Sequence, residues 1–322
     1  MKVFLFAGLL MLTSSHALAQ TSNSTASSAP AFDAANGDLA TPTGHEVSAG
    51  LASYTYSEPG EHAISIHGVK FVAEYAGTAS LNARRHWFVQ AHLWSTLGAA
   101  TYTGWCSPFF ITPNAASPNG YLLDLGDPSP CSEDGDSDWY AEGRALVGKD
   151  MIASTWAWAP YSGIGLRHLS NGTSGVAGYR TDDYLYVPLG LTARTDLAAH
   201  RVLSLDVEVD VLAHGWQHTN GSKLGGGDVP ATATAPAFTI DSFSDVAFSQ
   251  TRGWALRAGA TLPVTARWSL RPYYVRWDVQ SSPVESQTVT FTVNHVTARE
   301  QLGFFEPHNT TNEIGVRLGL HF

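Results

Sequence analysis

The residues best suited to chemistry lie in the stretch GIGLRHLSNG at 163–172, where His168 precedes Ser170 by two positions. A serine hydroxyl is a weak nucleophile until a base takes its proton, and histidine is the usual base. A carboxylate completes such a group by orienting the imidazole. Asp183 is available for this, directly before Tyr184-Leu185-Tyr186. Residues of these types at this spacing could carry out acyl transfer.

Strand alternation predicts where this group points. Side chains on a β-strand alternate between its two faces, so His168 and Ser170 share a face with Ile164 and Leu166. Asp183 shares a face with Leu185 in the same way, whereas Asp182 would point to the other side. The three residues are therefore expected on the apolar face of neighbouring strands.

The last ten residues, Glu313–Phe322, identify the architecture. Their sequence EIGVRLGLHF alternates apolar and polar residues and ends on an aromatic residue. This segment resembles the closing strand of bacterial outer-membrane β-barrels, which implies one face toward lipid and one toward the lumen.

Alternating segments recur along the chain, joined by alternating short and long connections, and predict an all-β, antiparallel, up-and-down transmembrane barrel. We expect ten strands, with twelve as the alternative. An even strand number and short periplasmic turns place both termini in the periplasm. Pro188 and the change of alternation near 272–274 each predict a β-bulge. The expected strands are 46–57, 66–79, 86–103, 138–148, 152–168, 181–195, 203–211, 250–263, 267–279 and 313–322.

The amino terminus has the layout of a secretory signal peptide. Lys2 precedes an apolar run, and Ala17-Leu18-Ala19 supplies a small-residue cleavage site. We predict a signal peptide at 1–19, a flexible periplasmic leader at 20–44 and the barrel at 45–322. This order predicts export to the cell outer membrane of a Gram-negative bacterium.

The net charge restricts the expected binding partners, and the two cysteines predict a disulfide. The net charge of −10 argues against nucleic acid. The expected partners are outer-membrane lipids, lipopolysaccharide and the assembly machinery that recognises the closing strand, with the barrel itself a monomer. Cys106 and Cys131 fall in one predicted outer loop, 104–137, and are expected to form a disulfide in an oxidising compartment.

Charged residues on the inward faces predict a network inside the barrel. The seventh strand carries three carboxylates in alternation with apolar residues, and arginines on other strands are plausible partners. Eight strands leave a lumen filled by side chains and sixteen leave a channel, so ten strands favour a charged plug. The expected network is Glu142, Arg144, Arg194, Asp206, Glu208, Asp210, Arg257 and Arg317.

The HxSNG string resembles outer-membrane phospholipase A, and its His-x-Ser order is similar to that of lipid A 3-O-deacylases. The resemblance covers about twenty residues and implies a lipid hydrolase with Ser170 as nucleophile, His168 as base and Asp183 in place of the phospholipase's orienting amide. The GIGLRHL and YLYVPLGL runs also resemble uncharacterised porin-like barrel proteins, which implies no catalysis.

Two functions follow as hypotheses. The first is a barrel without catalytic activity, either a narrow channel or a surface-exposed binding protein. The alternative is a serine esterase acting on membrane lipid at Ser170, His168 and Asp183. No cofactor or metal is expected, except calcium in the hydrolase alternative.

Overall fold

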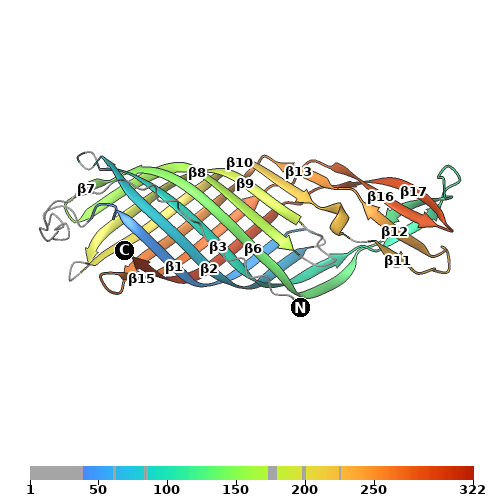
Figure 1. Ribbon diagram of the computed structural model, residues 1–322, viewed down its shortest axis with the longest axis horizontal. Coiled ribbons are helices and arrows are strands. Elements are labelled where there is room, and N and C mark those ends of the chain that lie inside the picture. Colours follow the sequence, from blue (N-terminus) through green and yellow to red (C-terminus); the bar gives the residue numbers. More distant parts are fainter. Residues whose placement is uncertain are drawn as a thin grey trace, which may run out of the picture.

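Ten long antiparallel strands form a closed ring, which confirms the predicted fold class and strand number. The computed structural model describes residues 39–60, 63–82, 84, 86–172, 180–197, 201–224 and 226–322. Each ring strand pairs with the next, and the last, β18, pairs with the first, β1, which closes the barrel (Figure 1). The ring strands are β1 (Gly44–Glu58), β2 (Ile64–Asn82), β3 (Trp87–Cys106), β6 (Ser129–Lys149), β8 (Trp156–Gly172), β9 (Arg180–Leu197), β10 (Arg201–Thr219), β14 (Gly253–Pro263), β15 (Trp268–Val279) and β18 (Asn309–His321).

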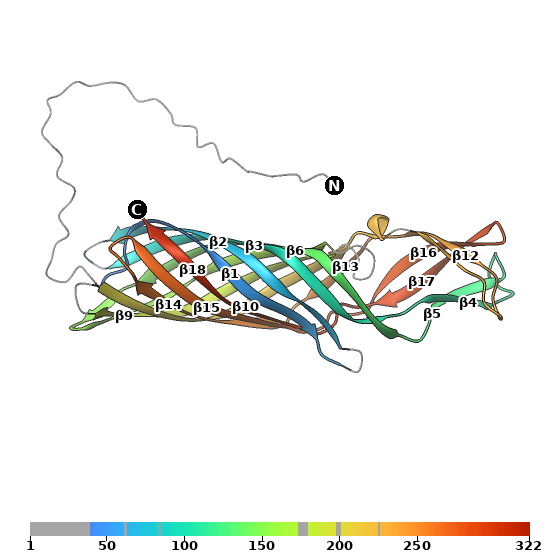
Figure 2. The same cartoon turned by 90° about the horizontal axis from the view of Figure 1, so that it is seen from below.

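Shorter elements extend the barrel at the end opposite the carboxy terminus (Figures 1 and 2). One hairpin and a four-stranded sheet make up most of this extension. Their strands are β4 (Phe109–Pro113) with β5 (Tyr121–Leu125), and β11 (Gly227–Val229), β12 (Phe238–Phe243), β16 (Glu285–Val293) and β17 (Val296–Phe304). The 3₁₀ turn Gly221–Lys223 follows β10, β13 (Val246–Gln250) pairs with the end of β10, and β7 (Met151–Ala153) pairs with β8 near the opposite end.

The two ends of the barrel differ in their connections. Short connections and the carboxy terminus lie at one end, and long connections form the extension at the other. In outer-membrane barrels the short turns are periplasmic, so the extension is extracellular. The predicted signal peptide, 1–19, and most of the predicted leader, 20–44, lie outside the described residues.

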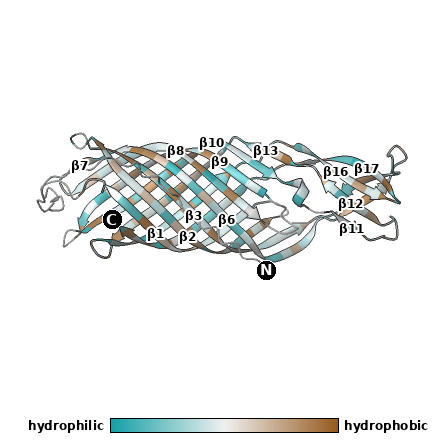
Figure 3. Ribbon diagram, in the orientation of Figure 1, coloured by the Kyte–Doolittle hydropathy of each residue, from teal (hydrophilic) through white to brown (hydrophobic). Residues whose placement is uncertain are grey.

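The outer surface of the ring carries an apolar belt. Large apolar side chains around the ring are exposed there, and Leu51, Leu93, Ile164 and Ile314 are more than half exposed. Figure 3 shows the matching alternation of apolar and polar residues along the strands. Exposed tryptophans border the belt: Trp87, Trp156, Trp158 and Trp268 on the periplasmic side, and Trp139, Trp216 and Trp254 on the extracellular side. Among the described residues, no helix is long and apolar enough to cross a membrane.

The bulge predicted near 272–274 is wrong. β15 keeps one register with β18 from Trp268 opposite Leu320 to Val279 opposite Asn309. Val275, Trp277 and Val279 are buried inside the barrel, while the outward positions between them are polar. The alternation changes because β15 leaves the apolar belt at this level, where its inward side chains become apolar and its outward side chains become polar. The strand does not slip in register.

The bulge predicted at Pro188 is also wrong. β8 and β9 keep the same register on both sides of Pro188, and the register shift lies on β10 between Leu212 and His214. The ladder pairs of β8 and β9 are interrupted next to Pro188, which has no N–H to donate.

The loop predicted at 104–137 is much shorter in the structure. β6 already begins at Ser129 and pairs with the end of β3, so the two strands continue together beyond the belt. Cys106 and Cys131 form the expected disulfide on this ribbon, with their Cα atoms 5.8 Å apart. The connection between the predicted strands 203–211 and 250–263 likewise contains the end of β10 and three further strands.

Candidate functional site

The predicted acyl-transfer group lies at the extracellular border of the apolar belt. His168 on β8 is the cross-strand neighbour of Asp183 on β9, and its Nδ1 lies 2.7 Å from the Asp183 Oδ1. The two side chains are 37% and 42% exposed, and the Trp139 ring packs on the imidazole with centroids 5.2 Å apart. Leu166 and Leu185 are the next outward residues toward the membrane centre. The pair therefore lies where lipid tails meet headgroups.

Ser170 lies near this pair but is not hydrogen-bonded to it. It follows His168 by two positions on the same face of β8, which separates their Cα atoms by roughly 7 Å. Its register partners are Trp139 on β6 and Thr181 on β9. In the described part of the chain no hydrogen bond joins Ser170 to His168. Catalytic hydrogen bonds often form only when substrate is bound, so this spacing leaves the proposed proton transfer within reach of a side-chain rotation.

The contact between His168 and Asp183 has the chemistry of a base and its orienting group. A carboxylate that accepts a hydrogen bond from Nδ1–H fixes the tautomer and leaves Nε2 free to accept a proton. Asp182, the other carboxylate considered, is 3% exposed and points inward, as its position in the alternation predicted. The catalytic roles of Ser170, His168 and Asp183 stay predictions.

Inside the barrel, Arg257 is the centre of a buried charge network. Its Nε lies 2.6 Å from the Asp210 carboxylate and 3.3 Å from that of Glu208, and its terminal nitrogen lies 2.8 Å from Glu142. Arg144 also pairs with Glu208. All five side chains are at most 10% exposed. These five members of the predicted network do meet.

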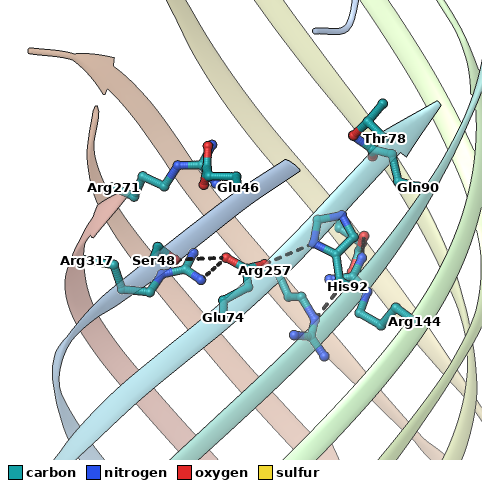
Figure 4. A network of polar contacts seen from close by, with 11 residues as sticks. Glu46, Ser48, Glu74, Thr78, Gln90, His92, Arg144, Arg257, Arg271 and Arg317 are labelled. Carbon is teal, nitrogen blue, oxygen red and sulfur yellow. Dashed lines mark hydrogen bonds and ion pairs between the residues drawn. The ribbon is translucent and has the colours of Figure 1, made fainter. Parts of the chain in front are cut away.

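The other three predicted members lie elsewhere. Arg317 pairs with Glu74, which also contacts the imidazole of His92 at 2.9 Å (Figure 4). Arg194 pairs with Asp150 at 2.8 Å. Asp206 joins none of these ion pairs and lines a chamber in the periplasmic half of the lumen.

Arg194 also holds the segment before β1. Its guanidinium donates to the Thr41 hydroxyl at 2.6 Å, and the Thr41 backbone N–H donates to Asp150 at 2.9 Å. Leu39 and Thr41 are both buried. The end of the predicted leader is thus fixed inside the periplasmic mouth, which strand alternation could not reveal.

A second buried layer was missed from the sequence. Lys70 and Asp138 pair at 2.8 Å with almost no exposure, and the Glu313 carboxylate accepts hydrogen bonds from Tyr140 and Tyr273. The Arg167 guanidinium lies 4.1 Å from the centroid of the Tyr140 ring. The alternation of β2 held the signal for Lys70, because its neighbours Val69 and Phe71 point outward.

These layers fill the lumen at mid-height. Arg257, Lys70 and the rings between them are nearly inaccessible, including Tyr54, Tyr186 and Trp277 at 0–1% exposure. A hollow lies on either side of them. The periplasmic chamber has a volume of about 760 Å³, and an extracellular cavity has a volume of about 430 Å³.

The extracellular cavity lies where the extension joins the barrel. Its apolar lining includes five phenylalanine rings and four aliphatic side chains: Phe109, Phe243, Phe248, Phe304, Phe305, Leu224, Val229, Ile240 and Val246. Arg180, Asp228 and Glu306 supply the charged groups of the lining. Arg180 lies 3.6 Å from both Glu58 and Glu306, and Tyr56 donates to Glu58 at 2.8 Å. No residue of this cavity was singled out from the sequence, because its walls come from segments far apart in the chain.

Glu306 lies between β17 and β18, outside the membrane-spanning strands, and its pKa is raised. Burial and the nearby Glu58 carboxylate raise its pKa to about 7, although Arg180 acts in the opposite direction. Within the described residues no group of three or more His, Cys, Asp or Glu side chains is arranged to hold a metal ion.

Comparison with solved structures finds other barrels at low sequence identity. The outer membrane protease OmpT from Escherichia coli is 10% identical, with a TM-score of 0.48, over 88% of this chain and 98% of that one. An outer membrane channel from Pseudomonas putida F1 is 11% identical, with a TM-score of 0.34, over 88% of this chain and 98% of that one. The translocator domain of the autotransporter NalP from Neisseria meningitidis is 9% identical, with a TM-score of 0.30, over 90% of this chain and 91% of that one. No family model and no curated protein matches the sequence.

The class of protein follows from the fold itself. A closed antiparallel ring leaves no unpaired strand edge in lipid, and its apolar belt lies between two borders of tryptophan. The chain is an outer-membrane β-barrel protein.

Proposed function

We propose that this barrel is a surface-exposed binding protein whose ligand enters the extracellular cavity. The apolar cavity of about 430 Å³ above a filled lumen carries this proposal. Its volume is within the range of small-molecule sites, and its lining combines apolar walls with a few polar groups, as such sites do. A ligand held there would contact the extension and the barrel together.

The filled lumen argues against the narrow channel. Solute would have to displace the ion pairs of Arg257 and Lys70, which are buried and would lose their partners. The same proposal includes export through a signal peptide at 1–19, assembly through the closing strand, contact with lipopolysaccharide and a monomeric state.

A neutral apolar probe tests the cavity. We expect N-phenyl-1-naphthylamine to bind the protein in nanodiscs with micromolar affinity, after subtraction of empty nanodiscs. Phe305→Ala should weaken binding by about threefold to tenfold, because Phe305 is 51% exposed and its ring gains only part of the roughly 1.5–3 kcal/mol that fully burying such a side chain is worth. Phe110→Ala is the matched control, since Phe110 is 37% exposed on β4 and outside the cavity. Equal binding by all three proteins would contradict the proposal.

Planar-bilayer recordings test the closed lumen. We expect no conductance steps from the purified protein, because buried ion pairs and aromatic rings occupy the lumen at mid-height. A general porin inserted under the same conditions serves as the positive control. Discrete steps of reproducible size would instead support the channel.

A second candidate function is lipid hydrolysis at the outer face. The 2.7 Å contact between His168 and Asp183 favours it, together with the placement of Ser170 on the same face at the lipid border. Its substrate would be an ester bond of phospholipid or lipopolysaccharide. Release of fatty acid by the protein in detergent, measured with calcium and with a chelator, distinguishes this candidate from a purely binding barrel.

A further inference from the structure

We propose that the extracellular cavity selects an apolar molecule that carries one positive charge, such as an aromatic amine or a quaternary ammonium compound. This inference rests on the binding function proposed above and specifies the ligand of the same cavity. It follows from the charges at the base of the cavity and from the rings of its walls.

The base of the cavity has more negative than positive groups. Glu306 lines the cavity, and Glu58 lies just outside the lining against the same arginine. Both acids are at most 7% exposed, and Arg180 is the basic group 3.6 Å from each. Glu58 and Glu306 against Arg180 leave an excess of one negative charge when both carboxylates are ionised. Asp228 adds a further carboxylate to the lining itself.

Glu58 and Glu306 share one hydroxyl donor, Tyr56, and one basic neighbour, Arg180. Both contacts of Arg180 are 3.6 Å long, beyond the length of a good charge-assisted hydrogen bond. A buried carboxylate with shared partners is costly in its ionised form, so a cation that enters the cavity would favour ionised Glu306.

The walls favour the same kind of ligand. Five phenylalanine rings line the cavity, and the rings of Phe109 and Phe243 have their centroids 5.7 Å apart. The faces of aromatic rings attract cations and bury apolar groups equally well. A carboxylate ligand would gain Arg180 but would face the excess acids, so anions are disfavoured.

The protonation of Glu306 links this selectivity to pH. Glu306 is surrounded by Tyr56 and Glu58 from β1 and by Arg180 and Asp182 from β9. With a pKa near 7, its carboxyl group is mostly neutral at pH 6 and mostly ionised at pH 8. A bound cation favours the ionised form, so the affinity for a permanent cation should rise by about tenfold over that interval.

Calorimetry with three matched ligands tests the inference on the full protein in nanodiscs of neutral lipid. The ligands are 4-phenylbutyltrimethylammonium, the neutral 4-phenylbutanol and the anionic 5-phenylpentanoate. At pH 8 we expect the cation to bind at least about tenfold more tightly than the alcohol, and the anion more weakly than both. The pH comparison uses the unmodified protein and does not depend on any variant.

Glu306→Gln should remove most of the preference for the cation and abolish its pH dependence. Glu300→Gln on β17 is the matched control, because Glu300 lies outside the cavity lining, and it should change neither. Binding of the neutral ligand or naphthylamine probe without any preference for the cation would overturn this inference and leave the binding function intact. Failure of every ligand, the neutral probe included, would overturn both.

Discussion

Replacing Arg257 by methionine lowers the free energy of unfolding of the barrel by about 3–5 kcal/mol, the range for removing one partner of a buried ion pair. Arg257 contacts Glu142, Glu208 and Asp210, and these carboxylates are at most 2% exposed. Methionine fills a similar volume but provides no donor, so the acids lose their main compensating charge. Arg144 can still pair with Glu208 but not with the other two at comparable distances.

Equilibrium unfolding in urea from lipid vesicles, followed by tryptophan fluorescence and by heat-dependent gel mobility, measures this loss. Arg276→Met is the matched control, because Arg276 is 37% exposed beyond the apolar belt and lies 3.9 Å from Asp278. Exposed ion pairs contribute at most about 1 kcal/mol, so this variant should unfold nearly as the unmodified protein does. Equal destabilisation by the two substitutions would show that the lumen network does not hold the barrel together.

The second large effect concerns the outer-face group. If the barrel hydrolyses lipid, Ser170→Ala removes the nucleophile and lowers the rate of fatty-acid release by at least about a thousandfold. Asp183→Asn should lower it by about a thousandfold to ten-thousandfold, because the amide no longer holds the imidazole of His168 in the tautomer that accepts a proton. Neither change touches the buried network, so both variants should fold and keep the heat-modifiable mobility of the barrel.

Covalent labelling separates catalysis from contamination in this experiment. A fluorophosphonate probe should label the unmodified protein at Ser170 and fail to label Ser170→Ala. Ser162→Ala is the matched control, since Ser162 lies on the same face of β8 within the belt and should leave rate and labelling unchanged. Fatty-acid release that is equal in Ser170→Ala and in the unmodified protein would remove the hydrolase from consideration and leave the binding barrel.

Local alternation was enough to predict the fold and the direction of most side chains. The EIGVRLGLHF segment predicts a strand with one face toward lipid, and β18 has Ile314 and Leu318 exposed on the outer surface and Arg317 inside. The same rule places His168 and Asp183 outward and Asp210 inward. These predictions succeed because the pleat of a strand fixes the direction of each side chain from its neighbours alone.

The alternation of side chains does not predict the height of a residue along the barrel axis. The change of alternation in β15 was predicted as a bulge, whereas it marks the level at which the strand leaves the membrane. The sequence carries no direct measure of that level, because it depends on how all ten strands tilt and close into one ring.

Side-chain partners were decided only by the tertiary structure. The sequence places Arg257 and Arg317 inside the barrel, but Arg257 pairs with acids of β6 and β10 while Arg317 pairs with Glu74 of β2. The cavity brings together Arg180 of β9 and Glu306, which are far apart in the chain. Alternation is a property of one strand, whereas contacts across a lumen depend on the closure, register and height of strands that meet only in the folded barrel.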